Sequence, residues 1–328
     1  YLSPIIAALS HNIAQLLPGS LDISYFCNSG SEAVEGAVKM AYKYHEGKRD
    51  FILHSDISFH GILLGAGGLT ASPELTFKFP TIPNIEKYIY NNIDSVKAKI
   101  KNLKKQNGES NVYAIILETL NASSLNKCDK AFVNELRNIC TENDIVLIFD
   151  EVYTGWAKTG KLFHFFNYNS IPDIVTYAKS FGGGKSSISG YTCLPKIFKK
   201  AYGSFNTAIL HSTTYNGFGE ECVTAIEALN IIVDENLVEK SQRIFAKLNS
   251  KLRLLQNKYP EFIDDVRGAG ALNGLILNGE LNPILKAAIK FIPSSFFNDK
   301  RFGKKLITSA VIAELYSAHN ILVFYGDN

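Results

Sequence analysis

A lysine and an aspartate are the residues of this sequence with the clearest chemical meaning. Lys179 follows the short apolar run 174–175 and precedes three glycines at 182–184. Asp150 follows the apolar run 146–149, a pattern typical of a buried strand. Open α/β sheets hold their ligands at the carboxyl ends of strands, so we expect Asp150 at such an edge. A lysine amine and a nearby carboxylate are what pyridoxal phosphate chemistry requires: the amine forms a Schiff base with the cofactor aldehyde, and the carboxylate keeps the pyridine nitrogen protonated.

Taken alone, a strand-end aspartate is more commonly structural and a lysine is more commonly solvent-exposed. Short motifs elsewhere in the chain, however, support the interpretation. The motifs are Asn28-Ser29-Gly30-Ser31-Glu32-Ala33, Phe59-His60-Gly61, the segment 149–160 around Asp150, His211-Ser212-Thr213-Thr214-Tyr215 and Val266-Arg267-Gly268-Ala269-Gly270. In this order and at these separations, from about residue 23 to about 277, the set resembles the class III aminotransferases. That family binds pyridoxal 5'-phosphate on the fold type I scaffold, and the resemblance implies that Lys179 and Asp150 are the catalytic residues.

The turn around Gly30 is the expected phosphate site. Ser29 and Glu32 have the spacing of a capping box, which predicts that a helix begins here. Free backbone N–H groups and the helix dipole make such a turn attractive to an anion. The resemblance implies that Gly30 and Ser31 hold the cofactor phosphate, although helix capping alone would also explain the serines.

The resemblance assigns further cofactor-binding residues. Phe59 would stack on the pyridine ring, with His60 beside it. Glu118 matches the first acid of the family's Glu-Pro motif near the active site. Thr214, or Thr213 if the register differs by one, would reach the phosphate from the neighbouring subunit of a homodimer with shared active sites. No metal site is expected.

Four positions depart from the family pattern. Thr119 replaces the proline of the Glu-Pro motif, and Lys158 stands where members usually have arginine. Tyr153 stands where many members place glutamine against the ring oxygen of the cofactor, and its phenol could donate a hydrogen bond there. Ser123 occupies the position of the second acid of ornithine-type members. We therefore expect an amine donor that is handled differently from ornithine.

The expected activity is a ping-pong transamination that moves an amino group from an amine or ω-amino acid to a carbonyl acceptor. An aminomutase on the same scaffold, a non-catalytic homologue and an excised domain of a multidomain biosynthetic enzyme are the alternatives. Retention of Lys179 and Asp150 weighs against a non-catalytic role. The residues do not indicate which donor or acceptor is used.

Bulk composition agrees with a soluble, globular enzyme. The 328 residues carry a formal net charge of +3, and 46% are hydrophobic against 20% charged. This charge is too small to favour nucleic acid or membrane partners. Five cysteines are scattered without metal-ligand or disulfide spacing, which favours a reducing compartment and hence a cytoplasmic location. No apolar run approaches the ~20 residues of a membrane span, and no signal-peptide pattern is present at the start.

Alternating strand and helix patterns predict an α/β fold with a mostly parallel sheet sandwiched by helices. The expected strands are 24–27, 50–54, 112–117 and 146–149, and the expected helices are 94–103, 130–142 and 237–255. We expect a large cofactor-binding domain at 1–240 and a partial small domain at 241–328. The segment 278–305 fits the family poorly, which favours an insertion. Because the chain starts at Tyr1 and not at methionine, we expect a portion of a longer polypeptide, with an incomplete small domain and the family's substrate-carboxylate arginine beyond Asn328.

Overall fold

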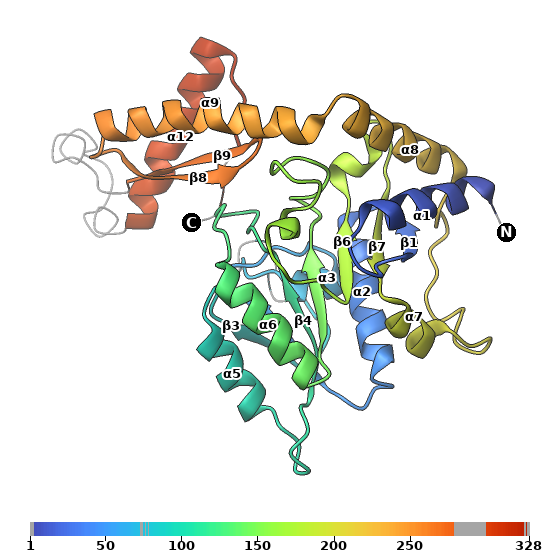
Figure 1. The fold of residues 1–328 in the computed structure, drawn as a ribbon. Coiled ribbons are helices and arrows are strands. Elements are labelled where there is room, and N and C mark those ends of the chain that lie inside the picture. Colours follow the sequence, from blue (N-terminus) through green and yellow to red (C-terminus); the bar gives the residue numbers. More distant parts are fainter. Residues whose placement is uncertain are drawn as a thin grey trace.

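The computed structural model describes residues 3–72, 75, 77, 79–278, 300–324 and 326. Its centre is a seven-stranded sheet with the order β1-β7-β6-β5-β4-β2-β3 (Figure 1). The strands are β1 (Ile23–Cys27), β2 (Phe51–Ser55), β3 (Ile85–Tyr88), β4 (Val112–Leu117), β5 (Val146–Asp150), β6 (Ile174–Tyr177) and β7 (Ser189–Cys193). β7 runs antiparallel to both of its neighbours, and the remaining pairs are parallel. The prediction of a mostly parallel sheet is confirmed.

Helices cover both faces of this sheet. The elements outside the sheet are α1 (Pro4–Leu16), α2 (Gly30–Tyr44), α3 (Leu64–Gly68), α5 (Ile93–Asn102), α6 (Lys130–Glu142), η1 (His164–Asn167), η2 (Lys179–Gly182), α7 (Pro195–Tyr202), α8 (Gly219–Asp234), α9 (Leu237–Lys258), β8 (Ile263–Ala269), β9 (Leu272–Leu277) and α12 (Lys300–His319). Here η marks a 3-10 helix. α2 and α7 pack on one face, and α1, α5, α6 and α8 pack on the other.

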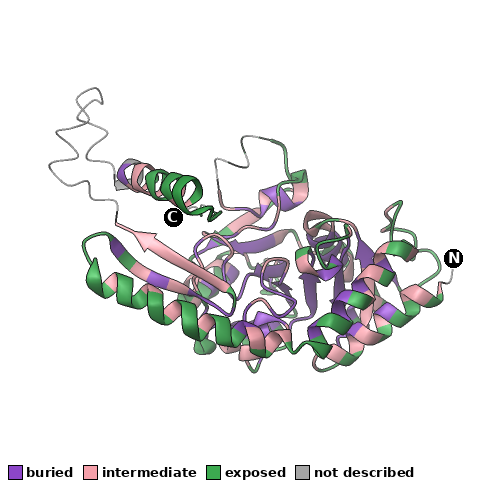
Figure 2. Cartoon of the chain, turned by 90° about the horizontal axis from the view of Figure 1, so that it is seen from above, coloured by how far each residue is buried: buried purple, intermediate pink, exposed green. Residues whose placement is uncertain are grey.

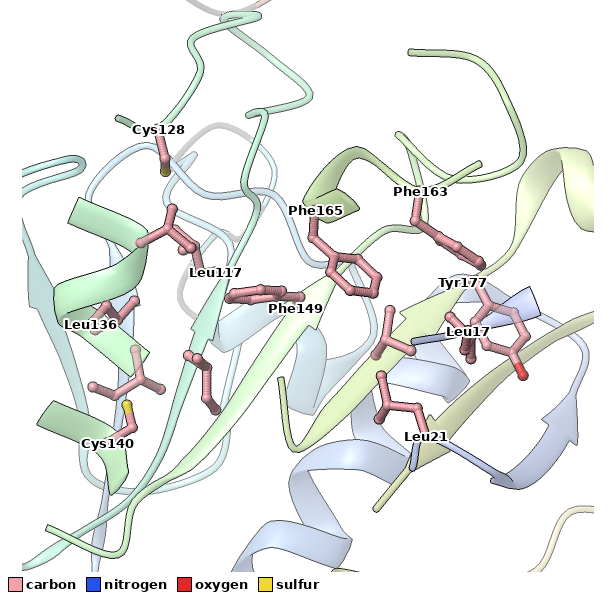
Figure 3. Packing of buried hydrophobic residues seen from close by; sticks show 14 of the residues in the cluster. Leu17, Leu21, Leu117, Cys128, Leu136, Cys140, Phe149, Phe163, Phe165 and Tyr177 are labelled. Carbon is pink, nitrogen blue, oxygen red and sulfur yellow. The ribbon is translucent and has the colours of Figure 1, made fainter. Parts of the chain in front are cut away.

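Two hydrophobic cores result, because successive strand residues point to opposite faces. Ile148 of β5 belongs to the core under α2 and α7. Its neighbour Phe149 belongs to the other core, together with Leu117 of β4 and Leu136 of α6 (Figure 3). Every residue of β4 and β5 is buried, which explains why both strands are continuous apolar runs in the sequence. This rigid centre fixes the position of Asp150 at the end of β5.

A smaller unit follows the sheet domain in the chain. The antiparallel hairpin β8–β9 packs against α9, a 22-residue helix that is largely exposed along its length (Figure 2). The predicted division between residues 240 and 241 falls in the first turns of α9 and stays a prediction. The expected insertion at 278–305 lies largely outside the described residues. Within the part of the chain that the structure describes, no helix is long and apolar enough to cross a membrane.

Candidate active site

A cavity of about 360 Å³ opens where β5 and β6 end and α2 begins. Six of the residues predicted from the sequence line it together: Gly30, Ser31, Phe59, His60, Asp150 and Lys179. The sequence reasoning missed other residues of its wall, among them Val152 and the segment 186–188. Val152 lies two positions after Asp150, where the chain leaves the strand and turns along the cavity. The three remaining predicted residues, Glu118, Tyr153 and Thr214, do not line this cavity.

The start of α2 forms one wall of the cavity. Ser29 caps the helix, and the backbone N–H of Glu32 donates to its Oγ at 3.3 Å. The Glu32 carboxylate accepts in return from the backbone N–H of Ser29 at 2.7 Å, which completes the predicted capping box. The positive end of a 15-residue helix therefore faces the cavity, and Gly30 and Ser31 stand at that end.

Two glycines allow the backbone to approach closely here. A Cβ atom on Gly30 would lie 2.7 Å from Cγ1 of Val152. Gly61 has φ of +119°, and a Cβ on it would lie 2.2 Å from Oγ of Ser31. A side chain at either position would fill the space beside the start of α2. Because both residues are glycines, this space forms a small cradle at the helix N-terminus, which suits a phosphate group.

Asp150 is fixed by three hydrogen bonds. Its Oδ2 lies 2.7 Å from Nδ1 of His60, and its Oδ1 accepts from the backbone N–H of Val152 at 3.0 Å and from Oγ1 of Thr176 at 3.1 Å. A carboxylate only accepts hydrogen bonds, so Nδ1 of His60 is the donor. Nε2 of His60 is buried without a hydrogen-bond partner among the described residues. His60 therefore serves to orient Asp150.

Glu118 lies behind the cavity wall and holds the loop that carries Phe59. Its carboxylate accepts from the backbone N–H of Phe59 at 2.8 Å, from the backbone N–H of Ala122 at 2.8 Å and from the side chain of Asn121 at 2.9 Å. Burial raises the pKa of Glu118 to about 7, and the charge of Asp150 acts in the same direction. The structure thus gives Glu118 a contact with the backbone of Phe59 and no place on the cavity surface.

Lys179 opens η2 with φ of +52°, a left-handed conformation that non-glycine residues adopt rarely. Its Nζ lies 5.4 Å from the centre of the Tyr153 ring. Tyr153 was expected against a cofactor oxygen; in the structure it lies beside the lysine amine, outside the cavity lining. Burial raises the pKa of the Tyr153 phenol, which therefore stays protonated at neutral pH.

Thr214 is exposed and lies away from the cavity of its own chain. The backbone N–H of the preceding Thr213 donates to the hydroxyl of Tyr25 at 2.9 Å, which ties this segment to β1. Large apolar side chains nearby in the sequence are also exposed, with Phe205 at 97% and Ile209 at 84%. Thr214 therefore lies on a segment of the chain that also exposes several large apolar side chains.

Glu151 is a structural residue that the sequence reasoning missed. It is fully buried, and its carboxylate accepts from the backbone N–H groups of His164 at 2.9 Å and Phe165 at 2.8 Å, and also from Oγ1 of Thr154. Burial raises the pKa of Glu151 to about 7. An acidic pair at the end of a buried run was the available signal: Asp150 faces the cavity, while Glu151 holds η1 from within.

The chain is similar to known proteins in both sequence and fold. The family model described as Aminotransferase class-III matches residues 3–291. A solved transaminase from the marine bacterium Virgibacillus is similar at 25% identity and a TM-score of 0.82, over 97% of this chain and 70% of that one. A thermostable (S)-enantioselective ω-transaminase from Thermomicrobium roseum is similar at 26% identity and a TM-score of 0.78, over 90% of this chain and 68% of that one. An ornithine aminotransferase from Toxoplasma gondii shares the fold at 24% identity and a TM-score of 0.77, over 87% of this chain and 66% of that one.

Proposed function

This chain belongs to the class III aminotransferase family, and we propose that Lys179 and Asp150 are the residues that perform its transamination. The family uses pyridoxal 5'-phosphate, and its reaction moves an amino group from an amine to a carbonyl acceptor. The observation that carries the assignment is that both side chains line one cavity together with the start of α2.

The residues present fit the cofactor. The cradle at Gly30, Ser31 and Gly61 offers backbone N–H groups and the positive end of α2 to a phosphate, in space that a Cβ atom would fill. Phe59 offers an aromatic ring in the same cavity, against which the flat cofactor ring can stack. Bound pyridoxal phosphate supplies an aldehyde that accepts amino groups and a ring that accepts electrons.

The chain's own residues then divide the work. Lys179 would hold the cofactor through its amine, and the same amine, when free, would serve as the base that moves a proton during transamination. Asp150 would keep the pyridine nitrogen of the bound cofactor protonated. His60 keeps Asp150 in place, because Nδ1 donates to the carboxylate from the buried side. Glu118 contributes indirectly, through the backbone of Phe59.

For the substrate we propose a terminal amine or an ω-amino acid handled differently from ornithine. Ser123 stands where ornithine-type members have a second acid, and it lies in the short loop 120–127 that follows Glu118. A hydroxyl there leaves no carboxylate to neutralise a cation that binds the substrate. The ω-transaminase described from Thermomicrobium roseum is consistent with such a donor.

We also propose a homodimer in a reducing compartment such as the cytoplasm. Exposed Thr214 and the apolar side chains near it favour burial against a second copy. All five cysteines are free and buried, as a reducing compartment favours.

Borohydride reduction tests the proposed lysine. Reduction of the cofactor-loaded enzyme, followed by peptide mapping, should place the pyridoxyl group on Lys179, and a Lys179→Ala variant should remain unlabelled. Lys185 and Lys158 are the internal controls, because both lie in neighbouring segments of the chain. A label on either of them in the parent enzyme would contradict the assignment.

A further inference from the structure

Lys158 is held at both of its ends. Its ammonium donates to Oγ of Ser180 at 3.0 Å, and Ser180 directly follows Lys179. Its backbone carbonyl accepts from Oγ of Ser241 at 3.0 Å and from the backbone N–H of Ala271 at 2.7 Å. One residue thus joins η2, which carries Lys179, to α9 and to the turn between β8 and β9. Burial and the charge of Lys179 lower the pKa of Lys158 to about 8, as expected of an ammonium enclosed next to the site.

The loop 154–160 makes a second contact with η2. The ring of Trp156 stacks on Phe181 with a centroid distance of 4.6 Å and an interplanar angle of 9°. Trp156 and Ala157 both have positive φ, at +64° and +67°, so the loop bends sharply at this point. Such backbone conformations persist only where surrounding contacts hold them. The loop therefore depends on what packs behind it.

The β8–β9 turn packs directly behind the loop. Gly270 has φ of +57°, and a Cβ on it would lie 2.3 Å from the carbonyl oxygen of Lys158 and 2.4 Å from the backbone nitrogen of Gly160. The side chain of Gln242 donates to the carbonyl of Gly160 at 2.7 Å. Oγ of Ser241 accepts from the backbone N–H of Ala271 at 2.9 Å while it donates to Lys158. Backbone contact and hydrogen bonds leave the loop little freedom on this side.

We propose that Lys158 is a positioning residue for Lys179, and that it transmits the packing of α9 and the β8–β9 turn to η2. The relevance of this coupling to transamination rests on the proposed function. The coupling itself is a property of the cofactor-free chain, so it can be measured separately.

Amide hydrogen exchange of the cofactor-free protein tests the coupling. The reporters are two amides at the ends of η2: Phe181 donates to the carbonyl of Ala178 at 3.1 Å, and Gly183 donates to the carbonyl of Ser180 at 3.0 Å. Ser241→Ala removes the hydroxyl that donates to the Lys158 carbonyl and accepts from the N–H of Ala271, and neither of these bonds involves η2. It should speed exchange of both reporters about fivefold, the effect of one hydrogen bond on an opening equilibrium. Ser250→Ala is the matched control, because Ser250 lies on the same helix and its hydroxyl donates to the carbonyl of Lys247.

Two substitutions of Lys158 test the residue itself. Lys158→Met keeps the apolar stem and removes the donor, so it should speed reporter exchange and slow the uptake of pyridoxal phosphate, followed by absorbance. Lys158→Arg keeps a donor and should restore both. In the Lys158→Met background, Ser241→Ala should have little further effect on η2.

Unchanged exchange in Ser241→Ala, or equal effects of Ser241→Ala with and without Lys158→Met, would overturn the proposal. Exchange that stays fast in Lys158→Arg would overturn it as well. Failure of the proposed function would look different: the parent protein would take up no pyridoxal phosphate, while the exchange pattern could still be measured.

Discussion

Gly61 shows how one missing side chain shapes the candidate phosphate cradle. Its φ of +119° lies in a region that residues with a Cβ rarely adopt, and the space beside it is already taken by Oγ of Ser31. The backbone after His60 can therefore pass close to the start of α2. Any larger residue would have to move either the loop or the serine, and both form the wall of the cavity.

We expect Gly61→Ala to weaken the binding of pyridoxal phosphate by tenfold or more. Strain of about 1–3 kcal/mol at such a backbone position corresponds to roughly this loss. Titration of the cofactor-free protein, followed by absorbance, measures it. Gly108→Ala is the control, because Gly108 also has positive φ, at +84°, but nothing lies within 4 Å of its Cβ position. Equal affinity in the two variants would show that the cradle is not the phosphate site.

Residues at strand ends and helix starts were the predictable part of the site. Asp150 follows from an apolar run that is buried on both faces, and Gly30 follows from a capping box, since both are local patterns. The position of Tyr153 was harder to predict, because a loop residue points wherever tertiary contacts turn it. Val152, two positions after the end of β5, lines the cavity, and Tyr153 does not.

At the scale of elements, two adjacent acids, Asp150 and Glu151, stand at the end of β5, one at the cavity and the other in the protein interior. Asp150 accepts three hydrogen bonds at the cavity, and Glu151 accepts the N–H groups that begin η1. The side chains of neighbouring strand residues point to opposite faces, which separates the two carboxylates. Asp150 and η1 are thus fixed by the same strand end.

Glu151→Gln should change how stability depends on pH. The pKa of Glu151 is raised from 4.5 to about 7 by burial, so its contribution to stability is full below pH 4.5 and is lost as the pH rises through about 7. Glutamine does not titrate. As the pH rises from about 4.5 to about 8, the parent should therefore lose up to about 3 kcal/mol of unfolding free energy relative to the variant. Urea unfolding of the cofactor-free proteins at several pH values measures this change, and a stability difference that is constant with pH would contradict the burial of a titrating acid.

The elements that are predicted best are those with a uniform pattern of apolar residues. β4 and α6 match the expected ranges 112–117 and 130–142, because one is apolar throughout and the other has a regular apolar stripe. β7 was not predicted, since its Ser189 and Thr192 look like loop residues. Both are buried and paired: Ser189 donates to the carbonyl of Ser29, and Thr192 bonds the hydroxyl of Tyr177. The partners that permit polar residues in this strand come from β6 and from the turn before α2, which the local pattern of residues 189–193 does not reveal.

At the scale of the whole molecule, several large apolar side chains are exposed among the residues that the structure describes. Phe205, Ile209 and Tyr215 are exposed on the segment that carries Thr214, and Ile62 is exposed next to the cradle at Gly61. Nothing in the order of residues along one chain indicates which surface meets a second copy. The expectation of a shared site therefore came from the family resemblance, and the exposure of Thr214 is compatible with it.

Hybrid dimers test whether Thr214 serves the neighbouring subunit. A Lys179→Ala chain is expected to be inactive, and a Thr214→Ala chain should bind pyridoxal phosphate about tenfold more weakly, because it loses a hydrogen bond to a charged group. If Thr214 crosses the interface, a hybrid of the two variants contains one intact site, with Lys179 from one chain and Thr214 from the other. Differently tagged chains, purified together, should then regain about half of the parent activity at limiting cofactor. A hybrid of Lys179→Ala with Thr213→Ala checks the register. No recovery in either hybrid, or a monomer by light scattering that still binds the cofactor tightly, would show that each chain completes its own site.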